Sequence, residues 1–364
     1  MIVASPAGHK ARRGVCVFDF QSEFVRPTKE TMTKINCSAD GLSDEIAHDN
    51  LFKLEFRDIL FHMKNYIDLH MHSSCSDDGE FSPTELVRQC KEAGVRVMSI
   101  TDHDSARANA EARAEAEKLG IKYISGIEID CRFKGINLHL LGYGFDDSSS
   151  DFVVLENHIL SGERVASRER LVLTRKLGFD ISEAELNAVS NIDDGTGVWT
   201  GELFGEILLE KSEYLEHPLL LPYRIGGERS DNPFVNFYWD YYSQGTPCYV
   251  EVDFPTIEEA VTIIKDNGGK AVLAHPGNNL GGRFELFDQV VGTGIDGVEV
   301  FCSYHDKDTA KYFCEQAKKH SLIITCGSDY HGKTKPSVRL GETGSWLDPQ
   351  QIECQFCPTL CPSD

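Results

Sequence analysis

Two closely spaced histidines are the first residues in the chain whose types and spacing could do chemistry. A short apolar run from Tyr66 to Leu69 leads into His70 and His72, and Asp77 follows five residues later. Side chains alternate faces along an extended strand, so the two imidazoles are expected to point the same way. A lone pair of this kind also occurs among ordinary surface histidines. We predict that these three side chains begin a metal site, and the downstream residues decide between the two readings.

Further residues with ligand side chains recur near the ends of later apolar runs. They are His103 in TDHD, Glu128 in GIE, His139 in INLHLLGYG, His275 in AHPG, and Asp329 and His331 in SDYH. Helix-like stretches separate the runs, which predicts βαβ units and a parallel sheet. In such sheets functional groups gather beyond the carboxyl ends of the strands. A single histidine is usually a core or surface residue, but the recurrence of the whole set argues for one shared site.

The set contains six histidines and three carboxylates, which exceeds the three or four protein ligands of one ion. It suits two or three divalent ions that share bridging carboxylates. Nitrogen and oxygen ligands without thiolate favour Mn, Zn or Fe. Such ions lower the pKa of a bound water, neutralise phosphate charge and align the attacking and leaving oxygens. We therefore predict hydrolysis at phosphorus. The chain has no G-x-S-x-G nucleophile motif, and no covalent intermediate is needed.

The elements that must position these residues can be placed from caps and periodicity. Ser82-Pro83-Thr84-Glu85 has the form of a capping box and starts a helix that ends at Gly94. Strands are expected over residues 95–100, 122–125, 136–143, 247–252, 270–274, 297–301 and 322–326, and helices over 106–119, 257–267 and 308–320.

Residues 147–246 break this rhythm and are predicted to form a mostly helical insertion. Helices are expected over 151–177, 182–189 and 200–210, followed by a segment rich in Pro, Gly and aromatic residues. We interpret the insertion as a lid subdomain near the site; a purely stabilising subdomain is the alternative. The other predicted parts are an N-terminal extension (1–64), the first (65–146) and second (247–345) parts of the α/β domain, and a C-terminal tail (346–364).

Composition excludes several classes of function. A net charge of -22 disfavours binding to a nucleic-acid duplex, which requires clustered Lys and Arg. No apolar segment approaches the 18 residues of a membrane span, and no signal peptide is recognisable. We expect a cytoplasmic protein with reduced thiols. Cys354, Cys357 and Cys361 contain a CxxC, but without a second pair free thiols in a loose tail are favoured over a metal site.

These motifs together resemble the PHP (polymerase and histidinol phosphatase) superfamily over residues 66–145 and 247–340. The resemblance implies a distorted, seven-stranded (β/α) barrel with a trinuclear site. It assigns His70, His72, Glu128 and Asp329 to the first metal, Asp77, His103 and His331 to the second with Glu128 bridging, and His139 and His275 with Glu128 to the third.

The place of the insertion is similar to a branch that includes nucleotide phosphatases and oligoribonucleotide 5′-exonucleases. Many members with an insertion carry an Arg-His pair near the helix at 200–210, where this chain has Trp199-Thr200-Gly201-Glu202. Arg224 and Arg229 are candidate replacements for binding phosphate, with solvated loop arginines as the alternative. His305 is a candidate proton donor to the leaving group, with a surface histidine as the alternative.

The function predicted from these observations is metal-dependent hydrolysis of a phosphate monoester of a small nucleotide, a nucleoside monophosphate or a 3′,5′-bisphosphate, by metal-activated hydroxide. The alternative is a 5′–3′ exonuclease acting on short oligonucleotides. A non-catalytic PHP module is a third reading from another class, and it is disfavoured because all nine ligand positions are filled.

Overall fold

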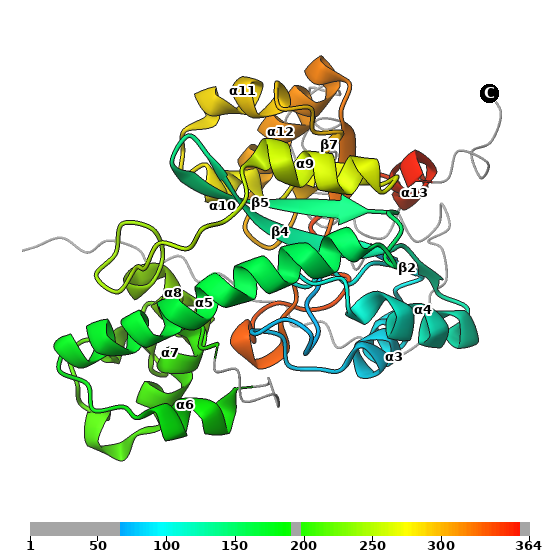
Figure 1. Cartoon of the computed structure of the whole chain (residues 1–364). Helices are drawn as coiled ribbons and strands as arrows, with labels where there is room; N and C mark the ends of the chain where they lie inside the picture. Colours follow the sequence, from blue (N-terminus) through cyan, green and yellow to red (C-terminus); the bar gives the residue numbers. More distant parts are fainter. Residues whose placement is uncertain (1–65, 191–197, 357–364) are drawn as a thin grey trace, which may run out of the picture. The chain divides into compact units, whose positions relative to one another are not determined.

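Two β-sheets form the centre of the computed structural model, which describes residues 66–190 and 198–356 (Figure 1). The predicted N-terminal extension lies outside the described residues. The first sheet has three parallel strands in the order β1–β2–β3, with bounds β1 (Ile67–Asp68), β2 (Val97–Met98) and β3 (Lys122–Tyr123). The second has the order β4 to β8, with bounds β4 (Gly126–Phe133), β5 (Ile136–Tyr143), β6 (Lys270–Leu273), β7 (Gly297–Phe301) and β8 (Ile323–Cys326).

The second sheet is mixed, whereas the sequence predicted a parallel one. β4 pairs with β5, and β5 with β6, in antiparallel register, and only β6, β7 and β8 run parallel. The reason is the tight turn between β4 and β5, where Lys134 and Gly135 both have positive φ. A two-residue turn can only join antiparallel neighbours, because a parallel pair needs a long crossover. The strand expected over 247–252 is also absent from the described chain, where these residues form turns and irregular structure.

Backbone contacts join the edges of the two sheets and bring the strand ends around one centre. The amide of Leu69 donates to the carbonyl of Cys326 at 3.0 Å, which places β1 beside β8. On the other side, an isolated parallel bridge pairs His103 with Glu128. The strands therefore close into a distorted barrel of the kind the resemblance implied. Ligand residues that are distant in sequence share one end of it.

Helices cover the sheets and form the insertion. Around the sheets lie α3 (Pro83–Ala93), α4 (Ala108–Leu119), α9 (Ile257–Asp266), α10 (Pro276–Asn279), α11 (Phe287–Val291), α12 (Lys307–His320) and α13 (Pro349–Phe356). The insertion contains α5 (Ser150–Lys176), α6 (Glu183–Val189), α7 (Gly201–Glu210) and α8 (Pro233–Tyr241). Short 3-10 turns are η1 (Ser212–Tyr214), η2 (Leu221–Tyr223), η3 (Phe284–Leu286) and η4 (Gly332–Thr334). The capping box predicted at Ser82 is confirmed, and it supplies hydrogen bonds that the first turn of α3 lacks.

The insertion has an apolar core of its own. Trp199, Phe204, Phe237 and Tyr242 are buried together there, separate from the barrel core. Figure 1 shows α6, α7 and α8 gathered beside the long helix α5. A separate core lets this subdomain hold its shape while its edge faces the barrel.

Residues 349–356 of the predicted C-terminal tail form α13. In α13, Ile352 is fully buried in the barrel core, and the ring of Phe356 packs edge-on against Tyr143. The side chain of Gln355 hydrogen-bonds both backbone groups of Ile324 on β8. Cys354 lies in this helix, whereas Cys357 and Cys361 lie outside the described residues. None of the helices in the described ranges combines the length and apolarity that a membrane crossing requires.

Candidate metal centre

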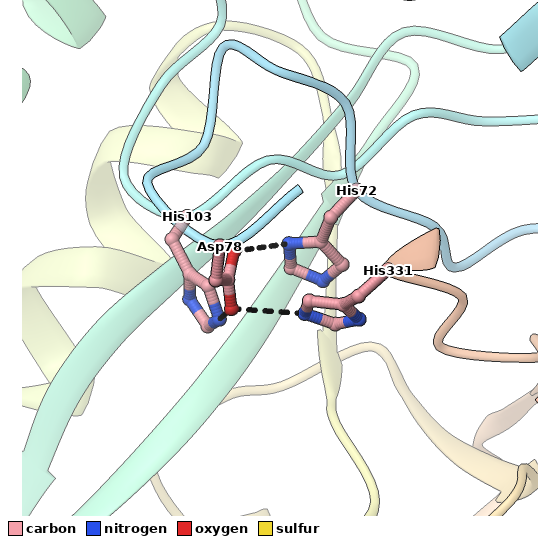
Figure 2. A group of neighbouring side chains, drawn as sticks. All are labelled: His72, Asp78, His103 and His331. Atoms are coloured by element: carbon pink, nitrogen blue, oxygen red, sulfur yellow. Dashed lines mark ion pairs between the residues drawn. The ribbon is translucent and has the colours of Figure 1, made fainter. Parts of the chain in front are cut away.

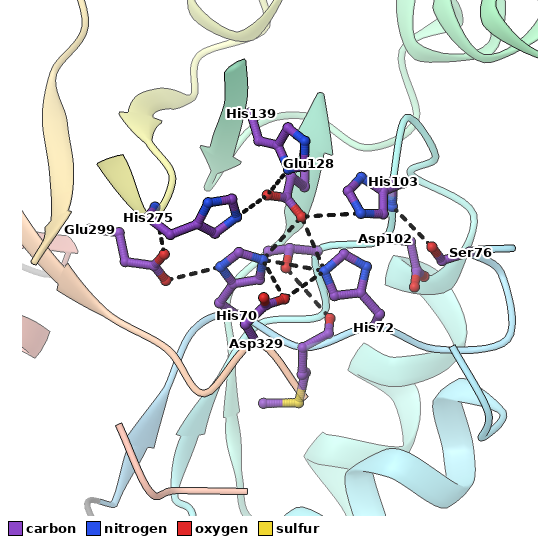
Figure 3. Close-up of polar contacts among 12 residues, drawn as sticks. His70, His72, Ser76, Asp102, His103, Glu128, His139, His275, Glu299 and Asp329 are labelled. Atoms are coloured by element: carbon purple, nitrogen blue, oxygen red, sulfur yellow. Dashed lines mark hydrogen bonds and ion pairs between the residues drawn. The ribbon is translucent and has the colours of Figure 1, made fainter. Parts of the chain in front are cut away.

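Ligand-type atoms converge at the end of the barrel in three overlapping groups, within each of which they lie no more than 4.8 Å apart. Figure 3 shows most of these side chains pointing toward one another from separate strands and loops. The groups are His70, His72, Glu128 and Asp329; His72, Asp78, His103 and His331; and His103, Glu128 and His139. His275 joins the same centre through Glu128.

The first group is fully buried and unusually tight. His70 Nε2 lies 3.0 Å and His72 Nε2 3.1 Å from Glu128 Oε2, and both nitrogens lie 3.3 Å from Asp329 Oδ1. The two ring nitrogens are themselves only 3.2 Å apart. Two carboxylates and two facing imidazole nitrogens with no access to water need a compensating cation. The spacing and donor types fit a divalent ion with mixed nitrogen and oxygen ligands.

The second group contains Asp78, not the predicted Asp77 (Figure 2). Asp78 Oδ2 lies 3.0 Å from His331 Nε2 and 3.8 Å from His103 Nε2. Although burial opposes ionisation, these histidines hold the pKa of Asp78 well below its usual value. The hydroxyl of Ser76 donates to Asp78 Oδ1 at 2.6 Å and helps to aim the carboxylate.

Asp77 lines the neighbouring cavity but belongs to none of the three groups in the described chain. Burial, together with the charges of Glu163 and Asp78, raises its pKa to about 7. The two aspartates are adjacent in a loop, so spacing alone could not decide which one faces the histidines.

Glu128 connects the groups because its two oxygens face different partners. Oε2 faces His70 and His72, whereas Oε1 lies 3.0 Å from His139 Nδ1 and 3.0 Å from His275 Nε2. The charges of His70, His103 and His139 hold the pKa of this buried carboxyl well below its usual value against the effect of burial. This is the geometry of a bridging carboxylate.

Two residues that the sequence analysis did not assign to the site, Glu299 and Lys335, contact the proposed ligands. Glu299, in the middle of β7, lies 2.9 Å from His70 Nδ1 through Oε1 and accepts from the backbone amide of His275 through Oε2. It therefore orients two ligands from different strands. The buried ammonium of Lys335 pairs with Asp329 on the oxygen that faces away from the histidines. A carboxylate within the predicted strand 297–301 was a usable signal for Glu299, but Lys335 follows no motif.

The three residues predicted to act on the substrate do not line the cavity. Arg224 donates to the backbone carbonyls of Leu209 and Tyr214, and Arg229 pairs with Asp240 at 2.8 Å. His305 is buried, and both of its ring nitrogens are engaged: Nδ1 with the carbonyl of Val300, and Nε2 as acceptor from the amide of Gly277.

The ligand groups open into a cavity of about 300 Å³ whose walls come from the barrel and from the insertion. Its cationic lining residues are Arg107, Arg170, Arg283 and Lys335. On the insertion side it is lined by Glu202 of α7 and by aromatic residues of α8, among them Tyr238 and Trp239. Burial raises the pKa of Glu202 to about 7. Residues 199–202 stand where many members with an insertion carry the Arg-His pair, and in this chain they place the carboxyl group of Glu202 in the cavity wall.

Comparison with known proteins identifies relatives of this chain. The PHP domain family matches residues 68–194. The 5′–3′ exoribonuclease Rnm of Escherichia coli is 30% identical over 285 residues, which cover 77% of this chain and 89% of that protein. A 3′,5′-nucleoside bisphosphate phosphatase of Chromobacterium violaceum is 28% identical over 281 residues, or 76% and 91% of the two chains. A phosphoribosyl 1,2-cyclic phosphate 1,2-diphosphodiesterase of Eggerthella lenta is 27% identical over 271 residues, or 73% and 94%.

Solved structures show the same arrangement of the chain. An amidohydrolase from C. violaceum with bound sulfate and no metal superposes with a TM-score of 0.63 at 25% identity, covering 75% of this chain and 91% of that one. A chain from Bifidobacterium adolescentis, assigned as a metal-dependent phosphoesterase, gives a TM-score of 0.64 at 25% identity, covering 80% and 95%.

Proposed function

This chain belongs to the PHP family. We propose that it is a metal-dependent phosphoesterase that hydrolyses a phosphate monoester of a small nucleotide and releases inorganic phosphate. The observation that carries the proposal is the Glu128 carboxylate, whose two oxygens face separate sets of histidines at the end of the cavity. A bridging carboxylate between nitrogen ligands is what a centre of several divalent ions requires.

The residues that hold the ions in this proposal are His70, His72, Asp78, His103, Glu128, His139, His275, Asp329 and His331. Asp78 replaces the Asp77 of the sequence prediction. Two or three ions of Mn, Zn or Fe suit this donor set. Such ions supply charge neutralisation at the phosphate and a nucleophilic water near neutral pH.

Arg283 is the cavity cation that we assign to the substrate. Arg107 pairs with Glu156 and Arg170 with Glu163, and Lys335 pairs with Asp329. Arg283 donates its Nε to the carbonyl of Leu280, and within the described ranges its guanidinium has no carboxylate partner. A guanidinium with free N–H groups suits a phosphate oxygen. It takes the role that the sequence prediction gave to Arg224 and Arg229.

A small nucleotide is favoured over a polymer by size and charge. A volume of about 300 Å³ is at the lower end of small-ligand pockets. The net charge of -22 opposes an extended polyanion. The insertion acts as a lid in this proposal, since α7 and α8 supply one wall of the cavity. A cytoplasmic location stays a prediction.

The second candidate is a 5′–3′ exonuclease on short oligonucleotides, favoured by the 30% identity to the E. coli exoribonuclease. Both reactions use the same ligands, so product analysis separates them. Purified protein, with Glu128→Ala as the control variant, is given AMP, a 3′,5′-bisphosphate and a 5′-labelled short RNA with added Mn²⁺. Inorganic phosphate alone supports the phosphatase, and stepwise mononucleotides support the exonuclease. No metal and no product from any ester would refute both.

A further inference from the structure

Asp130 is an acidic residue beside the metal centre to which the sequence assigned no role. It lies two residues after Glu128 on β4, so both carboxylates project from the same face of the strand. In the antiparallel register of β4 and β5, Asp130 is directly opposite His139. Its side chain is 23% exposed and lines the cavity.

The carboxylate of Asp130 contacts two proposed ligands from their far sides. Asp130 Oδ1 lies 3.3 Å from His103 Nδ1 and 3.4 Å from His139 Nε2. The opposite nitrogens of the same rings, His103 Nε2 and His139 Nδ1, lie 3.7 Å and 3.0 Å from Glu128. Each imidazole is thus held between Glu128 on the side of the metal centre and Asp130 behind it.

Backbone contacts keep Asp130 at this position. Its amide donates to Asp104 Oδ1 at 2.9 Å, and the amide of Asp104 donates to the carbonyl of Glu128 at 2.7 Å. Asp104 has φ 54°, a left-handed conformation that is uncommon outside glycine, and from there its side chain accepts the amide of Asp130 in the middle of β4. Because Asp104 directly follows His103, this arrangement locks the His103 loop against the strand that carries Asp130.

We infer that Asp130 is a positioning residue shared by two ion positions. In the inferred metal-bound state its carboxylate accepts the N–H of His103 Nδ1 and of His139 Nε2, from which Oδ1 lies 3.3 Å and 3.4 Å away without a formed hydrogen bond in this structure. The lone pairs of His103 Nε2 and His139 Nδ1 would then face the ions. A hydrogen-bonded partner behind a ligating histidine fixes both its tautomer and its ring orientation. His103 belongs to the second and the third ligand group and His139 to the third, so loss of this one carboxylate weakens both positions together. The inference rests on the metal centre proposed above.

The test measures bound metal, not activity. Asp130→Asn keeps the shape of the side chain but removes its charge. Glu251→Gln is the matched control, since Glu251 is 70% exposed and pairs with Arg132 on the same strand away from the cavity. Metal-free proteins are titrated with Mn²⁺ and bound metal per chain is measured by mass spectrometry, with Mn²⁺ spectra recorded in parallel. His139→Ala marks the loss of a single position.

In Asp130→Asn we expect the Mn²⁺ dissociation constants of two positions to rise together by about 10–100-fold, as is typical when such a partner is removed. The Glu251→Gln control should bind like the wild type, and the His139→Ala protein should be weakened at one position. Wild-type occupancy in Asp130→Asn, or a loss confined to one position as in His139→Ala, would overturn the shared role while leaving the metal centre in place. If Asp130→Asn does not fold, Asp130→Ser is titrated against the same outcomes. A wild-type protein that binds no metal refutes the centre itself.

Discussion

Replacing one or the other of two adjacent aspartates tests the assignment of the second ligand group. In Asp78→Asn we expect the amount of bound metal per chain to fall. Asp77→Asn should bind as much metal as the wild type. Asp78 Oδ2 lies 3.0 Å from His331 Nε2 and within 3.8 Å of His103 Nε2, so its negative charge is part of the group. Asp77 lies outside the group in the described residues, and burial raises its pKa to about 7.

The size of the effect follows from charge. At an effective dielectric constant of about 20, unit charges about 4 Å apart interact by about 4 kcal/mol, part of which is lost to desolvation of the carboxylate. Taking ~3 kcal/mol as the remainder gives a loss of about 100-fold in affinity at that position, since 1.4 kcal/mol is tenfold. For Asp77→Asn the change should stay within about threefold, or ~0.6 kcal/mol.

The assay is a Mn²⁺ titration of both variants and the wild type after chelator treatment, followed by hydrolysis rates at saturating metal. High Mn²⁺ should restore part of the activity of Asp78→Asn if the defect is metal affinity. Thermal unfolding of the metal-free proteins checks that both variants are folded. A pattern in which Asp77→Asn loses metal and Asp78→Asn retains it would refute the reasoning from the structure and reinstate the sequence-based assignment.

Three further outcomes follow from the cavity and its surroundings. Arg283→Ala should raise KM for a nucleotide about tenfold with little change in kcat, since a charge-assisted hydrogen bond contributes ~1.5 kcal/mol, whereas Arg224→Ala should lower the melting temperature and leave KM unchanged. In the metal-free protein, burial raises the pKa of Glu202 from 4.5 to about 7, so the folded state keeps a proton that the unfolded state loses. The unfolding free energy should therefore fall by about 3 kcal/mol as pH rises from 4.5 to 7, and urea titrations of Glu202→Gln should lack this fall. His305→Gln should reduce stability because both ring nitrogens are engaged, and an unchanged pH profile of kcat is expected; a lost basic limb would restore His305 as the proton donor.

Much of the fold followed from local patterns. Caps and periodicity placed the helix that begins after Ser82 and the insertion helices α5, α6 and α7 to within a residue or so. These features depend on hydrogen bonds and side-chain spacing within a few residues, which a sequence displays directly. The antiparallel β4–β5 pair departs from the predicted βαβ rhythm because Lys134-Gly135 forms a two-residue turn between the two strands.

Among the candidate site residues, the structure brings most of the predicted ligands together, and it differs from the prediction where loop conformation decides. The histidines, Glu128 and Asp329 lie together at one end of the barrel, although Glu128 and His139 come from within the antiparallel strands β4 and β5 and not from strand ends. The choice between Asp77 and Asp78 depends on one turn of a loop. No spacing rule predicts that outcome.

The sequence by itself determined the ligand types, their order along the chain and the helical character of the insertion. All three depend only on residue identity and on spacing within a few residues. Only the tertiary structure decided which carboxylates contact the histidines from behind and which of the cavity-lining cations has no carboxylate partner in the described ranges. Asp130 and Glu299 support imidazoles from other strands, and Arg224 and Arg229 are engaged by neighbours within the insertion while Arg283 faces the cavity. These roles arise from contacts between segments that meet only when the barrel closes.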